Sequence, residues 1–190
     1  WIDPYTRIAG EDFIKRAAPR QISLIGSWLV NEENGTITLG FADSGMKIAL
    51  FGVDKIDLTD RDRVREYFHT VHHEYCHIIN QKKPYSDEFA KITPSGYTAV
   101  WNNHTDAEAL QLGFISAYAR ANNIEDFAEM TAHMLIMGKT AWDTKINAIT
   151  SATGKEALRK KEAFVVNYFK SEWNIDFYEL QAEVQRKIQQ

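Results

Sequence analysis

The sequence predicts an α+β fold, with a small N-terminal β-sheet followed by a mostly helical remainder. Short apolar runs, partly β-branched and separated by turn sequences, occupy residues 22–53. From residue 60 onward, apolar residues instead recur at three- and four-residue steps. A chain of 190 residues can bury one substantial core. We therefore expect a single domain over 1–190, with a sheet-rich part over 1–55 and a helical part over 56–190.

The sheet-rich part is expected to follow a lead-in that holds a short helix around Glu11–Ala17. Three strands are predicted, at Ile22–Val30, Thr36–Ala42 and Met46–Val53. The turn sequences NEENG and DSG separate them, which favours a three-stranded meander. The third strand is the most continuously apolar of the three.

The helical part is expected to contain five helices. Thr59 or Asp60 can cap the first, and Pro84 ends it. Gly138 is the expected stop of the third helix. The predicted helices cover about 60–83, 105–121, 124–137, 155–170 and 176–188.

Composition and charge exclude several classes of protein. The net charge of −4 and a pI near 5.9 argue against nucleic acid as the main partner. Cys76 is the one cysteine, so no internal disulfide can form. No apolar run approaches the length of a transmembrane helix. The sequence starts at Trp1 with no basic-then-apolar leader, so we interpret it as a mature or trimmed chain whose targeting signal would lie upstream.

Histidines concentrate in the segment HTVHHEYCHIINQ, which starts at residue 69. Within it, residues 73–77 form an H-E-x-x-H pattern. In a helix, His73 and His77 lie one turn apart on one face and can bind one Zn²⁺. Glu74 lies about 100° around the helix and can take a proton from a zinc-activated water. The alternative is a structural helix that happens to be rich in histidine.

A third metal ligand must come from elsewhere in the chain. The extended pattern H-E-x-x-H-x-x-G-x-x-H is excluded, because Asn80 and Lys83 occupy its last two defined positions. The segment NNIEDFAEM offers Glu125 and Glu129, one turn apart on a predicted helix. One carboxylate can bind the metal while the other orients a ligand histidine. The alternative for this pair is a solvated acidic helix start, the role we expect for Asp126.

These two segments together resemble the gluzincin metallopeptidases, in which H-E-x-x-H is followed by a helix bearing Glu-x-x-x-Glu. EDFAE is similar to the Glu-Phe-Phe-Ala-Glu segment of the anthrax lethal factor type. The resemblance implies a zincin-like fold in which His73, His77 and Glu125 hold Zn²⁺. It also implies that Glu74 activates the attacking water.

The same resemblance assigns two supporting residues. Glu129 would orient a ligand histidine, with His73 as the expected partner. Tyr118, seven residues before the ligand glutamate, would donate a hydrogen bond to the developing oxyanion.

A wider stretch, about residues 20–137, is similar to a bacterial family of zinc-binding metallopeptidases. It runs from IGS and GTITLG through HHEYCH to EDFAE. Some members are described as lipoproteins associated with substrate import, near outer-membrane glycan-uptake genes. The similarity implies a periplasmic or outer-membrane-anchored lipoprotein and a possible association with outer-membrane uptake proteins. By fold analogy, Met46–Val53 is the expected edge strand that pairs with extended substrate.

The predicted function is that of a zinc-dependent metallopeptidase acting on a peptide or protein substrate. One alternative is a zinc-binding but non-proteolytic component of an outer-membrane nutrient-uptake system. Another is a hydrolase of a different amide or ester, because the motif activates water without choosing the substrate.

Other side chains are expected to have lesser roles. His69 would be a pocket residue at most, and His72 would pack or be exposed. Cys76 is expected to be a buried thiol rather than a ligand. His133, four residues after Glu129, could form a hydrogen bond with it. An aromatic group is expected to belong to the core: Tyr85, Tyr97 and Trp101.

Overall fold

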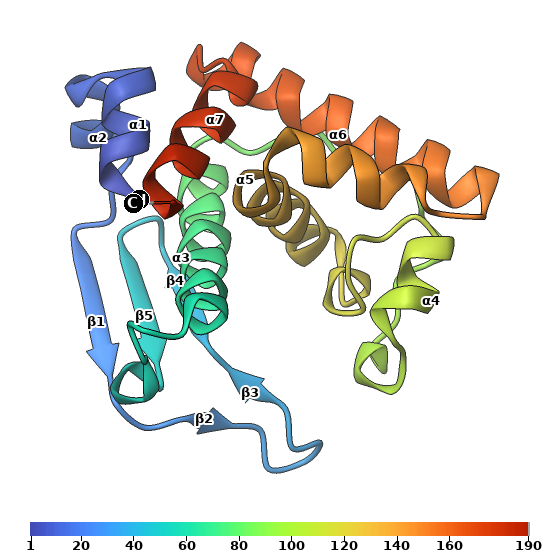
Figure 1. Cartoon of the computed structure of the whole chain (residues 1–190), viewed down its shortest axis with the longest axis horizontal. Helices are drawn as coiled ribbons and strands as arrows, with labels where there is room; N and C mark the ends of the chain where they lie inside the picture. The colour runs from blue at the N-terminus through green and yellow to red at the C-terminus, as the bar shows by residue number, and fades with distance from the viewer. Residues whose placement is uncertain (190) are drawn as a thin grey trace. The chain divides into compact units, whose positions relative to one another are not determined.

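The computed structural model describes residues 1–189 and divides the chain into two compact units. The first unit is Trp1–Pro84 and the second is Tyr85–Gln190. The first combines strands with the helix that carries the histidine-rich segment, and the second is built from helices (Figure 1). The α+β class is thus confirmed. The single domain over 1–190 stays a prediction.

The elements follow each other in the order shown in Figure 1. The first unit contains α1 (Ile2–Ala9), α2 (Glu11–Ala17), β1 (Gln21–Ile25), β2 (Leu29–Val30), β3 (Ile37–Thr38), β4 (Gly40–Asp43), β5 (Lys47–Phe51), the 3-10 turn η1 (Val53–Lys55) and α3 (Arg61–Lys82). The second contains η2 (Trp101–Asn103), α4 (Asp106–Gln111), η3 (Tyr118–Arg120), α5 (Asn123–Asn147), α6 (Ala152–Trp173) and α7 (Phe177–Ile188).

The strands do not form the predicted meander. The three-stranded sheet has the order β1-β5-β4, with β1 parallel and β4 antiparallel to β5. β2 and β3 form a separate two-stranded hairpin. The predicted strand Ile22–Val30 is interrupted after Ile25, and Thr36–Ala42 is interrupted at Leu39. Turn sequences predict where strands end, but they do not predict which strands pair.

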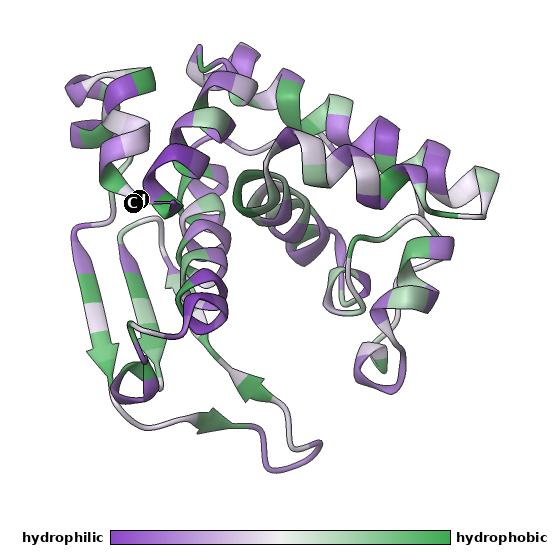
Figure 2. Cartoon of the chain, in the orientation of Figure 1, coloured by the Kyte–Doolittle hydropathy of each residue, from purple (hydrophilic) through white to green (hydrophobic). Residues whose placement is uncertain are grey.

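β5 is the central strand, so the prediction of Met46–Val53 as the edge strand is wrong. Four consecutive residues of β5, from Ile48 to Phe51, are buried. Both faces of a central strand can be covered, which explains its continuous apolar run, drawn mostly in green in Figure 2. Of the strands paired with β5, it is β4 that packs closely against α3.

The lead-in contains two helices rather than one. α2 matches the predicted Glu11–Ala17, whereas α1 was not predicted. Gly10, with φ 84°, joins them in a backbone conformation that glycine adopts readily. The Tyr5 and Phe13 rings stack with centroids 6.0 Å apart, and both side chains are buried. This apolar contact gives α1 and α2 a shared core.

α3 is the longest element of the first unit and matches its prediction closely. Asp60 caps it by accepting hydrogen bonds from the backbone N–H groups of residues 62 and 63. The Tyr67 hydroxyl donates to the Gly52 carbonyl oxygen at 2.6 Å, which ties the helix to the end of β5. α3 therefore lies on the sheet with one face held against β4 and β5.

The second unit is organised around α5, which packs against α6, α7 and η3. Its core is strongly aromatic: the Tyr85 ring stacks on Phe127 at 4.2 Å with an interplanar angle of 7°. Phe89 contacts the Phe127 ring edge-on, with centroids 5.1 Å apart. The three aromatics predicted for the core, Tyr85, Tyr97 and Trp101, are each only partly buried; Tyr97 contacts Phe114 and Trp101 contacts Tyr118.

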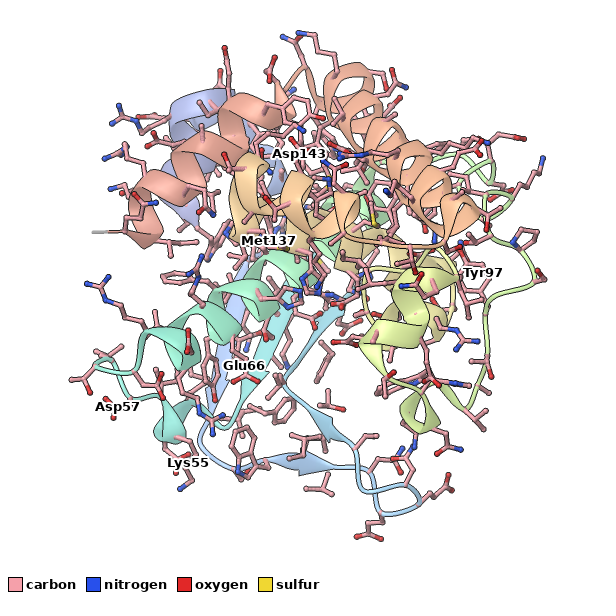
Figure 3. All side chains as sticks on the ribbon, turned by 45° about the vertical axis from the view of Figure 1, so that its right-hand side comes forward. Lys55, Asp57, Glu66, Tyr97, Met137 and Asp143 are labelled. Carbon is pink, nitrogen blue, oxygen red and sulfur yellow. The ribbon has the colours of Figure 1, made fainter. Side chains whose placement is uncertain are left out.

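α5 breaks at Gly138 but continues beyond it to Asn147, so the predicted end at Met137 is only partly right. Gly138 has φ 73° and ψ 164°, which is not helical. The break leaves backbone carbonyls of the preceding turn without helical donors. Gln181 of α7 donates to the Met134 carbonyl oxygen at 2.6 Å. Gln185 of α7 donates to the next two carbonyl oxygens, those of residues 135 and 136. Figure 3 labels Met137 and Asp143 on either side of the break.

The remaining helices differ from prediction mainly in length. The predicted helix over 105–121 is only the six-residue α4, begun by a capping box between Thr105 and Glu108. Gly113, with φ 86°, follows its end and prevents continuation. α6 is longer than predicted, covering Ala152–Trp173, and α7 is confirmed within a residue.

Candidate metal centre

The histidine face of α3 brings two of the predicted ligands together. The Nε2 atoms of His73 and His77 lie 3.0 Å apart, and the two rings are nearly perpendicular at 82°. Both side chains are buried. Two nitrogens that share a tetrahedral Zn²⁺ at ordinary bond lengths are about 3.3 Å apart. The pair therefore fits the two-histidine part of a zinc site through its Nε2 atoms.

Glu74 follows His73 directly and is buried, with 5% of its surface exposed. Its side chain lies against β4. A Cβ atom built on Gly40 would lie 2.9 Å from the Glu74 Cγ and 3.1 Å from its Oε1. The carboxylate of the predicted general base thus occupies space that β4 leaves open by carrying glycine.

His72 and Cys76 of α3 are placed as packing residues. His72 is 1% exposed and its ring lies 5.9 Å from that of Tyr5. Burial lowers the pKa of His72 to about 3, so it is neutral at physiological pH. Cys76 is the predicted buried thiol, and the Asn80 side-chain amide donates to its sulfur at 3.5 Å. His69 lies one turn before His73, with ring centroids 6.1 Å apart.

On the second unit, the predicted carboxylates lie at the start of α5. Asn122 caps this helix by accepting hydrogen bonds from the N–H groups of Ile124 and Glu125. Glu125 is partly exposed, whereas Glu129 is buried. The two side chains are one turn apart, as the sequence predicts. Glu125 therefore keeps partial contact with solvent, whereas Glu129 is enclosed by the second unit.

Glu129 is held by two neighbours within the second unit. Ser116 Oγ donates to Glu129 Oε2 at 2.6 Å and accepts from the backbone N–H of Ala119 at 3.1 Å. His133 Nε2 lies 3.4 Å from the same carboxylate oxygen, as its spacing predicts. Sequence reasoning missed Ser116, because a single serine in an irregular segment carries no pattern. Whether Glu129 also orients His73 stays a prediction.

Tyr118 lies in η3 rather than in the predicted helix, because α4 ends at Gln111. Its side chain is 37% exposed. The Trp101 ring contacts it edge-on with centroids 4.8 Å apart and an interplanar angle of 68°. An exposed phenol held by an aromatic neighbour suits a hydrogen-bond donor to substrate, and the assignment of that role stays a prediction.

Asp126 is not the solvated acid that the sequence predicts. Its side chain is fully buried and forms an ion pair of 2.6 Å with the equally buried Lys161. The Tyr97 hydroxyl donates to the same carboxylate at 2.9 Å. Burial raises the pKa of Asp126 to about 6, an effect that the positive charge of Lys161 opposes. The residue between the two candidate glutamates therefore anchors α5 in its own core.

The side chains that could hold a metal ion are His69, His73 and His77 of α3 and Glu125, Glu129 and His133 of α5. The sequence profile of a family described as "putative zinc-binding metallo-peptidase" matches residues 1–178. The chain belongs to this family. Membership agrees with the fit of the His73–His77 pair to zinc, and it confirms the family suspected from the sequence.

A solved structure that carries the same description gives an independent comparison. The crystal structure of a "putative zinc-binding metallo-peptidase" from Bacteroides caccae is 31% identical in sequence. It superposes with a TM-score of 0.79 and covers 99% of this chain and 72% of its own. No curated protein matches the chain. Among the described residues, no helix is long and apolar enough to span a membrane.

Proposed function

We propose that this member of the zinc-binding metallo-peptidase family is an active, gluzincin-type zinc peptidase. The observation that carries the proposal is the α3 arrangement: two imidazole Nε2 atoms 3.0 Å apart, with the buried Glu74 between them in sequence. At the same separation one neutral imidazole can donate a hydrogen bond to the other when no ion is bound, so metal content is the deciding measurement.

The proposed ligands are His73, His77 and Glu125. Two neutral imidazoles and one carboxylate leave a net charge of +1 on the site and one open position, as catalytic zinc sites commonly have. Glu125 suits this role because its side chain starts from a backbone position that the Asn122 cap fixes. Bound Zn²⁺ would supply Lewis acidity and lower the pKa of a water molecule.

The remaining chemistry belongs to the chain's own residues. Glu74 accepts the proton of the attacking water and passes it to the leaving amine nitrogen. Tyr118 donates its hydroxyl proton in a hydrogen bond to the oxygen of the substrate carbonyl, where negative charge develops. Glu129, oriented by Ser116, accepts a hydrogen bond from the second ring nitrogen of a ligand histidine, for which His73 is the proposed donor.

Metal content is the first test. Protein purified without added zinc is expected to carry about one zinc per chain by mass spectrometry, since one three-ligand site is proposed. Glu125→Ala should lose most of it, and Glu156→Ala, at an exposed position of α6, should retain it. Zinc retained in Glu125→Ala would reject this ligand. No zinc in the wild type, even after zinc is supplied, would reject the function.

Activity is tested separately through the proposed base. Glu74→Gln should keep its zinc and lose roughly 10²–10⁴-fold in kcat/KM on a peptide library, because the variant cannot accept the proton. An unchanged rate would contradict the role of Glu74. A wild type that binds zinc but cleaves neither peptides, other amides nor esters would instead indicate a binding component.

We also propose, from the sequence resemblance, that the protein works in the periplasm or at the outer membrane beside nutrient-uptake proteins, with a peptide or protein as substrate. Fractionation of cells expressing the natural full-length protein tests this. Recovery in the cytoplasmic fraction would reject it.

A further inference from the structure

Gly40 lies on β4, which packs against α3, and is paired with Leu50 of β5. A side chain at this position would point at the helix. Its Cβ would lie 2.9 Å from Glu74 Cγ, 3.1 Å from Glu74 Oε1 and 3.1 Å from Thr70 Cγ2. Carbon atoms in favourable contact are about 3.5–4.0 Å apart, so both carbon–carbon distances are too short.

The backbone gives no reason for glycine at this position. Gly45 and Gly52 of the same unit have φ values of 65° and 66°, in the left-handed region that favours glycine. Gly40 is not among the glycines with positive φ, so its backbone is open to any L-residue. The glycine is required by what lies opposite it, namely Glu74 and Thr70.

Neither neighbour can move aside without loss. Thr70 is buried, and its hydroxyl donates to the Glu66 carbonyl oxygen at 3.1 Å, which fixes the direction of its methyl group. Glu66, labelled in Figure 3, lies one turn earlier on α3. Glu74 is itself 5% exposed, and the atom nearest to the added Cβ is in the middle of its side chain. A side chain at residue 40 must therefore displace the Glu74 carboxylate.

We infer that Gly40 is a positioning residue: the side chain that it lacks defines where the Glu74 carboxylate lies. This inference rests on the proposed function for its catalytic meaning, because Glu74 is the proposed base. Its geometric part does not depend on activity. A general base acts within hydrogen-bonding distance of the proton it accepts, and misplacement by about 1 Å can reduce the rate about 10²-fold.

The geometric part is tested by a double-mutant cycle in metal-free protein. Gly40→Ala should lower the melting temperature by roughly 3–6 °C, the usual consequence of overpacking in a domain of this size. In a Glu74→Ala background the loss should be less than half as large, since the closest atom is removed. The Thr70→Ser background, which removes the methyl group, measures the remaining contact. Equal losses in the wild-type and Glu74→Ala backgrounds would overturn the inference.

The catalytic part is tested by kinetics and by the structure of the variant. Gly40→Ala should lose about 10²-fold in kcat with little change in KM or zinc content, and its crystal structure should show a displaced Glu74 carboxylate. Gly26→Ala is the matched control. Its Cβ would lie 3.3 Å from Asp54 Cγ, whose side chain is 54% exposed and can move away.

The outcomes separate the two proposals. Coupling between residues 40 and 74 with a displaced carboxylate supports the inference even if the wild type cleaves no substrate, in which case only the proposed function fails. A Gly40→Ala variant with the kcat of the wild type, or with Glu74 in its original place, overturns the inference while leaving the proposed function intact.

Discussion

α3 and α5 are both long helices that bury polar side chains, but they do so in different ways. On α5, Asp126 is paired with Lys161, and Glu129 accepts a hydrogen bond from Ser116. On α3, the buried imidazoles of His73 and His77 direct nitrogens at each other. The fold thus orients the carboxylates of α5 with its own donors, whereas the two histidines of α3 contact each other at a separation that the proposed zinc would also fit. On α5 the chain supplies the partners of the carboxylates, and on α3 the two histidines are the proposed ligands of zinc.

The largest expected effect comes from breaking the α5 anchor. Lys161→Met should lower the free energy of unfolding by about 3–5 kcal/mol, because it leaves the Asp126 carboxylate buried without its counter-ion. Urea unfolding measures this loss. The double variant Asp126→Leu with Lys161→Met should recover most of it, since an apolar pair of similar volume needs no counter-ion.

The neighbouring Lys160 provides the control. It forms an ion pair of 2.7 Å with Glu156, but both side chains are more than 60% exposed. Lys160→Met should leave the urea midpoint almost unchanged, because exposed ion pairs contribute little. Similar losses for Lys160→Met and Lys161→Met would contradict the anchor.

A smaller effect compares one backbone break in each unit. Gly138 and Gly10 have nearly the same backbone angles, with φ 73° and 84° and ψ 164° in both. Alanine at either position should lower the free energy of unfolding by about 1–3 kcal/mol through backbone strain. Gly138→Ala should cost more, because its Cβ would lie 2.8 Å from Gln185 Cγ, while nothing lies within 4 Å at Gly10. Thermal unfolding of the two variants gives the comparison, and a larger loss for Gly10→Ala would contradict it.

The last effect appears only at acidic pH and concerns the α3 helix. His72 has a folded-state pKa of about 3 because it is buried, whereas an unfolded histidine has a pKa of about 6.5. Between these values only the unfolded chain binds the proton, so the stability present above pH 6.5 is lost as the pH falls. At pH 5 the loss is about 2 kcal/mol. His72→Phe should remove this share of the pH dependence in metal-free protein, as followed by urea unfolding at pH 7 and pH 5. An unchanged slope would contradict the burial argument.

The part of the site on α3 could be predicted from the sequence because it is local. The cap at Asp60, the apolar period and the spacing of His73 and His77 all lie within one helix, and a helix converts sequence spacing directly into direction. Cys76 was predicted as buried for the same reason. No long-range contact was needed to place these residues.

What could not be predicted depends on residues far apart in the chain. The sequence predicts a solvated Asp126 because its partner lies 35 positions later, on α6, and a lysine in a charged stretch gives no sign of burial. β1 pairs in parallel with β5, although turn sequences favoured neighbours in sequence. Gly40 showed no pattern either, because the reason for a glycine there is a side chain on another element.

The two glutamines of α7 that serve the break in α5 have a consequence for synthesis on the ribosome. Gln181 and Gln185 bond carbonyls that lie 47 to 50 positions earlier in the chain. At a synthesis rate of about 5–20 residues per second, roughly 2–10 s pass between the translation of these carbonyl groups and the translation of the two glutamines. During that interval the turn before Gly138 must satisfy its carbonyls with water. We expect the second unit to gain resistance to proteolysis only after α7 has left the exit tunnel.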